Sequence, residues 1–198
     1  MKFAILLTSC VRNNNQDDLK MSYYLKAIDS WLNNTNLPIF IVESSGYTFP
    51  EFKNTRLNVC SFDLQNEPSS SQYEAKSILF AMGQFKEDLK EYTHILKVTA
   101  RYYIDSNTDR FENILSNLED VDIVLQSQVN HDIVWNNSEF FGFRNGLEHE
   151  ILNHILQQGF MENAIYNFSK NHTYARLSPM NNVYNVKRGG DGLIVNPL

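Results

Sequence analysis

The sequence has few cysteines, no long apolar run and no excess of positive charge, and each absence excludes a class of protein. Two cysteines, Cys10 and Cys60, supply neither a disulfide framework nor the ligand spacing of a metal site. We expect both to be buried free thiols, which is consistent with a reducing, cytoplasmic location. No stretch approaches the roughly 18 apolar residues of a membrane-spanning helix. The formal net charge of −6 argues against a general nucleic-acid-binding surface.

Several motifs that carry phosphate or hydrolytic chemistry are also absent. No G-x-x-x-x-G-K-[ST] occurs and no G-x-G-x-x-G follows the first apolar run, so P-loop nucleotide hydrolysis and dinucleotide redox chemistry lose their main support. Neither G-x-S-x-G nor H-E-x-x-H is present. What remains is an ordinary globular composition in a chain of 198 residues, and this length predicts a single domain over 1–198.

Apolar runs of strand length alternate with helical patterns along the chain. Strands are predicted at 3–8, 39–42, 57–62, 95–105, 122–126 and 139–143, with an edge strand at 182–186. Helices are predicted at 17–33, 73–89, 108–118, 147–157 and 161–170. This alternation predicts a Rossmann-type α/β/α sandwich with a mainly parallel central sheet.

Polar side chains gather at the predicted strand ends, where ligands of an open α/β sheet bind. Thr8, Ser9 and Arg12 follow the first strand, and Glu43 and Ser44 follow the second. A carboxylate can accept hydrogen bonds from a ribose or a base edge, and an arginine can hold phosphate oxygens in forked geometry. These residues therefore favour a nucleoside diphosphate. The alternative is a plain turn with a solvated carboxylate and a loose surface arginine.

The segment ILKVTARYYID, 95–105, has an unusual row of polar residues. Lys97, Thr99 and Arg101 alternate along it, where a buried strand would normally carry an apolar row. The order of FAILLTS, IFIVESSG, YEAKSILFAM and HILKVTARYYI resembles small glycosyltransferases of the GT-A type. Within it, KVTARY resembles the K-x-T-G-R-Y signature of polysaccharide-type nucleotide-sugar transferases, with Ala100 in place of the glycine. The resemblance extends from Phe3 to about Gly190.

The resemblance implies a site for a nucleoside-diphosphate sugar, with UDP the first choice of nucleotide because it is frequent in the family. In such enzymes the acidic tip of the second strand contacts the nucleoside, a role that falls here to Glu43 and Ser44. The helix start at Tyr73 and Glu74 would lie near the donor, although Glu74 also fits a plain helix-start acid. The implied reaction is transfer of one sugar to a glycan or glycoprotein acceptor. The nucleotide-binding part would cover about 1–105 and the acceptor-side part about 106–198.

The segment departs from the family at the place where most members bind a metal. A typical GT-A enzyme ends this strand with D-x-D, which holds a divalent ion against the diphosphate, whereas this chain has Thr99 to Arg101. A fixed guanidinium or ammonium can supply the same positive charge, so we expect Mn or Mg to be dispensable. The alternative is an oxygen-ligand site at Asp105 and Asp109. The same D-S-N-T-D stretch also fits a helix cap at Asn107 or Asp109.

Acidic residues late in the chain are candidates for a catalytic base. An inverting transferase needs a carboxylate that takes the proton of the acceptor hydroxyl, whereas a retaining one needs less from the protein there. Glu162, in GFMENAIY, ranks first and Asp191, in RGGD, second, with Glu139 at a predicted strand start as a further candidate. Glu162 also fits a structural acid at a helix N-terminus. Arg188 and Gly189 would form a turn closing over the phosphates, or belong to a disordered tail.

Aromatic residues late in the chain have two possible roles. Trp135 and the run F-F-G-F at 140–143 would form either a sugar-stacking wall or part of the core.

Two other functions are alternatives to sugar transfer. The main alternative is a non-catalytic nucleotide-sugar-binding module of a larger glycan-assembly protein. A nucleotidyltransferase is a weaker alternative, because the segment RNNNQDD after the first strand lacks the glycines of a phosphate-binding loop.

Overall fold

A computed structural model describes residues 1–12, 17–53, 56–65, 67–104, 108–130, 133–177 and 183–185. Its centre is a seven-stranded sheet in the order β3-β2-β1-β4-β7-β6-β8. The strands are β1 (Phe3–Ser9), β2 (Ile39–Glu43), β3 (Leu57–Ser61), β4 (His94–Thr99), β6 (Ile123–Asn130), β7 (Ile133–Arg144) and β8 (Tyr174–Leu177). The pairs β1–β2, β2–β3, β1–β4 and β6–β8 are parallel, and β7 runs antiparallel to β4 and β6. The predicted mainly parallel sheet is therefore confirmed.

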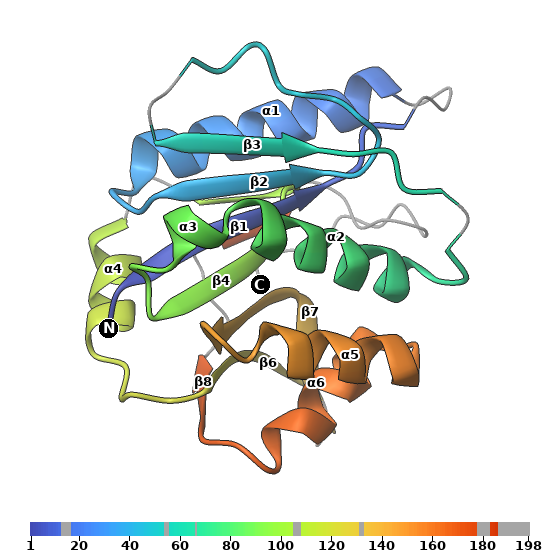
Figure 1. Cartoon of the computed structure of the whole chain (residues 1–198). Coiled ribbons are helices and arrows are strands. Elements are labelled where there is room, and N and C mark those ends of the chain that lie inside the picture. The colour runs from blue at the N-terminus through green and yellow to red at the C-terminus, as the bar shows by residue number, and fades with distance from the viewer. Residues whose placement is uncertain are drawn as a thin grey trace.

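Helices cover both faces of the sheet, which makes the structure a three-layer sandwich. The helices are α1 (Asp17–Asn34), α2 (Ser70–Gln84), α3 (Lys86–Leu89), α4 (Thr108–Ser116), α5 (Glu148–Gln158) and α6 (Met161–Ser169). Figure 1 shows α2, α3, α5 and α6 in front of the sheet and α1 behind it. Among the described residues no helix has the length and apolarity that crossing a membrane would require.

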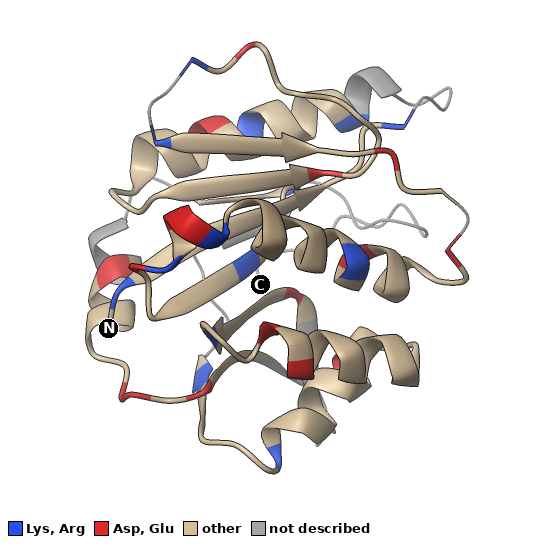
Figure 2. Cartoon of the chain, viewed as in Figure 1, with Lys and Arg blue, Asp and Glu red and all other residues tan. Residues whose placement is uncertain are grey.

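Two separate cores explain why the central strands are apolar along their whole length. Side chains alternate across a strand, so Ile5 and Leu7 of β1 pack against Ile28 and Trp31 of α1, while Leu6 packs on the α2 side. Because both faces of β1 are covered, each of its residues is buried. Two charged residues of these strands are also buried: Glu43 at the end of β2, and Lys97 of β4, the blue segment of that strand in Figure 2.

The predicted strand at 95–105 is wrong as one element, because the chain turns after Thr99. β5 (Tyr102–Ile104) pairs with β9 (Val183–Asn185) in a separate two-stranded sheet. The indole N–H of Trp31 donates to the Tyr102 carbonyl at 2.8 Å, and the Ile104 N–H donates to the hydroxyl of Ser30 at 3.1 Å. The backbone after the turn is thus bound to α1 and β9, which draws it away from the central sheet.

Other element boundaries also differ from the sequence predictions. The predicted helix at 73–89 begins three residues earlier, because the Ser69 hydroxyl accepts from the Gln72 N–H and caps α2, and it is interrupted at Phe85 before α3. β8 was not predicted, because this short strand at the sheet edge has no apolar alternation and three of its four residues are not buried. The remaining helices lie within one or two residues of their predicted ends.

Candidate functional site

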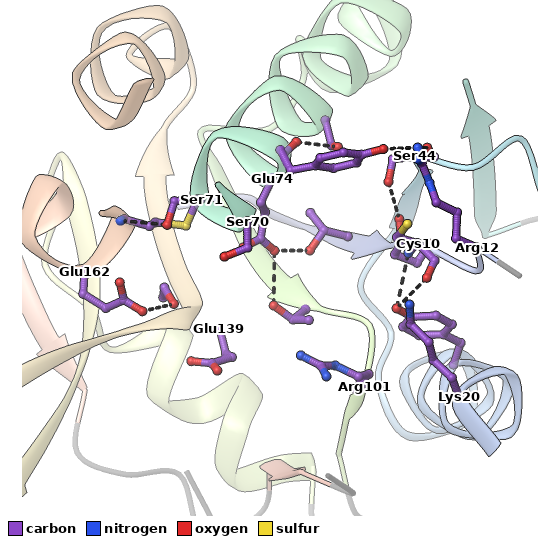
Figure 3. A pocket seen from close by; sticks show the side chains of 18 residues that line it. Cys10, Arg12, Lys20, Ser44, Ser70, Ser71, Glu74, Arg101, Glu139 and Glu162 are labelled. Carbon is purple, nitrogen blue, oxygen red and sulfur yellow. Dashed lines mark hydrogen bonds between the residues drawn. The ribbon is translucent and has the colours of Figure 1, made fainter. Parts of the chain in front are cut away.

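A pocket of about 710 Å³ opens at the carboxyl ends of β1, β2 and β4 (Figure 3). Its volume lies within the roughly 300–1,000 Å³ that is typical of small-molecule sites. Ten residues predicted from the sequence line it: Thr8, Ser9, Arg12, Ser44, Tyr73, Glu74, Thr99, Arg101, Glu139 and Glu162. They come from β1, α2, β4, β7 and α6 and from the segments that follow β1, β2 and β4, so residues far apart in the sequence meet in the pocket.

The strand directions explain why these residues meet. β1, β2 and β4 are parallel, and Thr8 of β1 is the register partner of both Val42 and Thr99, so the three strands end together. β7 runs antiparallel to β4 and its Phe140 pairs with Val98, so Ser138 and Glu139, which precede Phe140, reach the same edge. The first turns of α2 and α6 complete the walls.

Positive charge in the pocket comes from Arg12, Lys20 and Arg101. The Arg12 guanidinium donates to the Tyr73 hydroxyl, to the Ser44 carbonyl at 3.3 Å and to Asp63 at 3.4 Å, and it lies over the Tyr73 ring. No hydrogen bond or ion pair joins Arg101 to another described residue, and its guanidinium, with five N–H donors, lines the pocket. Two guanidinium groups and an ammonium suit a polyanion such as a diphosphate.

Glu43 lies behind the pocket, in contrast to the predicted direct contact with a nucleoside. Its carboxylate is completely buried and accepts four hydrogen bonds, from the N–H groups of Val11, Ser45 and Tyr47 and from the Ser45 hydroxyl, at 2.6–2.8 Å. Because its oxygens are already occupied, Glu43 holds the loops after β1 and β2 in place. Ser44, the next residue, does face the pocket.

Lys97 is also placed beneath the pocket and does not line it. Its side chain is 0% exposed, and its ammonium forms an ion pair with Glu74 at 2.7 Å. The same ammonium donates to the Ser138 carbonyl at 2.6 Å and to the Thr99 hydroxyl at 3.0 Å. Lys97 therefore does not contact the pocket itself, but it binds Glu74 and Thr99, which line it.

Two carboxylates lie on the β7 side of the pocket. Glu162 accepts a hydrogen bond from the Ser138 hydroxyl at 2.6 Å, and it belongs to the first turn of α6. The helix-start interpretation of Glu162 and the pocket interpretation are thus both compatible with its position. Glu139 lines the pocket too, but it lies inside β7 and not at a strand start as predicted.

The structure gives no side-chain position for several residues of the predicted site, among them Asp109. Asp105, Arg188, Gly189 and Asp191 lie outside the described residues. Of the two predicted N-caps, Asn107 lies outside the described residues, and Asp109 is excluded because α4 begins at Thr108 and Asp109 lies within its first turn. Within the described part of the chain, no three His, Cys, Asp or Glu residues lie close enough together to hold a metal ion.

Some pocket residues were not predicted. Lys20 and Tyr24 are four residues apart on α1, so they share one helix face, and this spacing was a usable signal. Burial raises the pKa of Tyr24 to about 12, so its hydroxyl stays neutral, and it exchanges hydrogen bonds with the backbone of Cys10. Ser138 gave no signal, because a lone serine in a polar stretch has no distinguishing pattern.

The cysteine and aromatic predictions have mixed outcomes. Cys10 and Cys60 are unpaired as expected but only half-buried, and burial raises the pKa of the Cys60 thiol to about 12. Phe140, Phe141 and Phe143 are 0% exposed and belong to the two cores, so they do not form a sugar-stacking wall. The side chain of Trp135 lies outside the described part of the structure.

No protein-family model and no curated protein matches the sequence. Residues 1–349 of S. aureus TarS, crystallised in complex with UDP-GlcNAc, superpose with a TM-score of 0.61 and 16% identity, over 97% of this chain and 60% of that chain. A glycosyltransferase involved in the glycosylation of the major capsid of PBCV-1 superposes with a TM-score of 0.57 and 8% identity, over 88% of this chain and 81% of that one. The chain thus spans less than two thirds of the TarS fragment, and these similarities show a shared fold.

Proposed function

We propose that this protein transfers a sugar from a nucleoside-diphosphate sugar to a hydroxyl of a glycan or glycoprotein acceptor. The observation that carries the proposal is the distribution of charge in one pocket. Arg12 and Lys20 lie on the β1 side, Arg101 follows β4, and Glu139 and Glu162 lie on the β7 side (Figure 3). Cations at one side suit the diphosphate, and a carboxylate at the other suits an acceptor hydroxyl.

The donor would be bound by the part of the chain up to about residue 105. Its diphosphate would contact Arg12 and Arg101, with Thr8, Ser9 and Ser44 as small polar neighbours. When the bond to the sugar breaks, negative charge grows on the leaving diphosphate, and preorganised cations stabilise that charge. The complex of TarS with UDP-GlcNAc supports UDP as the nucleotide and a hexose as the sugar.

The acceptor would be bound by the part after about residue 106. Glu162 is the proposed base: it would take the proton of the acceptor hydroxyl as the oxygen attacks the sugar carbon and the diphosphate departs. The hydrogen bond from Ser138 holds one oxygen of Glu162, so the carboxylate has a fixed direction. Asp191 is the second choice for this role, and the turn at Arg188 and Gly189 would close over the phosphates.

Arg101 is proposed to replace the divalent ion of related enzymes. It follows β4 directly and lies in the pocket without a protein counter-ion among the described residues. A guanidinium placed there provides fixed positive charge with forked donors, as a phosphate clamp requires. We therefore propose that Mn and Mg are dispensable, with Asp105 and Asp109 as the ligands if they are not.

A panel of nucleotide sugars tests the proposal. The protein is incubated with each donor and mixed glycan acceptors, with EDTA or with Mn, and the release of free nucleoside diphosphate is measured. We expect release from at least one donor, unaffected by EDTA and strongly reduced in Glu162→Gln. Glu150→Gln, an exposed acid on α5, is the matched control and should behave like the wild type.

The alternative, a nucleotide-sugar-binding module without catalysis, predicts a different result in the same experiment. A donor would bind, as measured by calorimetry, but no donor would be turned over with any acceptor. If nucleoside diphosphate is released only when Mn is present, the proposed role of Arg101 is wrong, and Asp105 and Asp109 become the proposed metal ligands.

A further inference from the structure

The ion pair of Lys97 and Glu74 beneath the pocket leaves one carboxylate oxygen without a donor among the described residues. Oε1 of Glu74 accepts from the Lys97 ammonium at 2.7 Å, from the Thr8 hydroxyl at 2.5 Å and from the Thr99 hydroxyl at 3.2 Å. Among the described residues no group donates to Oε2 of Glu74, whose side chain is 23% exposed and lines the pocket. Oε1 is thus saturated, whereas Oε2 has no hydrogen-bond donor within the described part of the chain.

Three donors on one oxygen hold the carboxylate in a single orientation. Lys97 comes from β4 and Thr8 from β1, two adjacent strands of the rigid central sheet, so the donors cannot move independently. The direction of Oε2 is set by the same contacts, because the two oxygens share one plane. An ionised carboxylate oxygen can only accept hydrogen bonds, so its ligand partner must be a hydroxyl or an N–H group.

The ion pair also explains how a carboxylate can sit beside a site for a diphosphate. An isolated negative charge there would repel the phosphates, and the repulsion would be stronger in a partly buried pocket than in water. Lys97 is 0% exposed and lies 2.7 Å from Glu74, so the pair is neutral as a unit. Glu74 can therefore accept a hydrogen bond from a ligand without adding net charge to the pocket.

We propose that Oε2 of Glu74 binds a hydroxyl group of the nucleotide-sugar donor, and that Lys97 is the positioning residue that holds Glu74 for this contact. The proposal rests on the proposed function and deepens it. Cations in the same pocket suit the phosphates, whereas a fixed acceptor suits the hydroxyl-rich parts of the donor on either side of them. Both the ribose and the transferred sugar carry hydroxyls, and the experiment separates the two.

Binding of donor analogues that each lack one hydroxyl tests the proposal. Affinities of UDP, 2′-deoxy-UDP, 3′-deoxy-UDP, UDP-GlcNAc and its mono-deoxy sugar analogues are measured by calorimetry on the wild type. One analogue should bind about 10- to 100-fold more weakly than its parent, because a hydrogen bond to a charged group is lost. A loss with a deoxyribose analogue assigns the ribose, and a loss with a deoxy-sugar analogue assigns the transferred sugar.

The main variant removes the ion pair as a unit, so that neither charge is left without its partner. Glu74→Leu combined with Lys97→Met replaces the pair by apolar side chains, an exchange that proteins often tolerate. In this double variant the parent ligand should bind as weakly as its deoxy analogue, while the deoxy analogue binds as it does to the wild type. Lys97→Met alone should reduce the difference in affinity between the parent ligand and its deoxy analogue, because Glu74 loses its fixed orientation. Lys76→Met, an exposed lysine of α2 paired with Glu67, is the matched control and should leave the discrimination unchanged.

The outcomes separate this inference from the proposed function. If the wild type binds UDP and UDP-GlcNAc but every deoxy analogue binds as well as its parent, the role of Glu74 is wrong while the proposed function stands. If the double variant still binds the parent ligand more tightly than the deoxy analogue, the proposed role of Glu74 is wrong as well. If no nucleotide or nucleotide sugar binds at all, the proposed function itself fails.

Discussion

Replacing Gly142 by alanine should destabilise the fold, because this glycine lies where the central sheet has no room for a side chain. A methyl group on Gly142 would lie 2.5 Å from Cδ2 of Leu96 and 3.1 Å from Cβ of Val124. These two residues are the register partners of Gly142 on the strands at either side, β4 and β6. The new methyl group would thus meet a neighbour in both directions along the sheet.

The cost follows from how little these neighbours can move. Leu96 and Val124 are both 0% exposed, so a displaced side chain enters a filled core. The Ile95 carbonyl, 3.3 Å from the added methyl group, is backbone and cannot rotate away. Overpacking of this kind typically costs about 1–3 kcal/mol. For a domain of this length that corresponds to a Tm lower by about 2–12 °C.

Equilibrium unfolding in urea measures the effect, with Gly83→Ala as the matched control. Gly83 is an exposed residue of α2, and no atom lies within 4 Å of the position of an added methyl group. Alanine there should stabilise the helix by about 0.5 kcal/mol. The two identical substitutions are therefore expected to act in opposite directions. A Gly142 variant as stable as the wild type would refute the packing argument.

Three further predictions concern the donor site, pH and the link between α1 and β5. Arg101→Ala should weaken UDP binding about 10- to 100-fold, because charge-assisted hydrogen bonds to the phosphates are lost. Arg101→Lys should bind UDP with intermediate affinity, because it keeps the charge but not the forked donors. An unchanged affinity of Arg101→Ala in calorimetry would contradict the proposal that Arg101 binds phosphate. Hydrogen bonds from Thr173 and Arg144 lower the pKa of Asp122, so its contribution to stability is complete above its unfolded pKa of about 4 and is lost as the pH falls through the lower folded value. The urea midpoints of the wild type and Asp122→Asn should therefore converge in acid, and a constant difference would exclude this linkage. Trp31→Phe leaves the Tyr102 carbonyl without its 2.8 Å donor and should lower the unfolding free energy by about 1–3 kcal/mol, which unaltered urea midpoints would disprove.

The layers of the fold and most of its elements could be predicted from sequence patterns. β1 and β2 are short apolar runs, and such runs are apolar throughout because helices cover both faces of the sheet. The segment 95–105 was predicted as one strand because it is rich in β-branched and aromatic residues and contains no glycine or proline. Its division into β4 and β5 depends on Trp31 and Ser30 of α1, about 70 residues away in the sequence, and no local pattern reports such contacts.

The candidate site could be predicted as a location but not as a set of contacts. Residues after the ends of parallel strands meet at one edge of the sheet, and this rule alone placed Thr8, Ser44 and Arg101 together. The rule does not say which side chains point into the pocket. Glu43 and Lys97 occupy the expected strand positions, yet both are buried behind the lining.

Which kinds of residue stand at the end of each strand could therefore be read from the sequence alone, because hydrophobic periodicity is a local property. Only the tertiary structure decided what each charge does, because a charge acts according to its burial and its partners. Lys97 appeared in the sequence as a cation facing a ligand, and in the fold it neutralises Glu74, a residue of a helix on the face of the sheet. A buried ammonium must find a counter-ion, and the identity of that counter-ion depends on how α2 packs against β4.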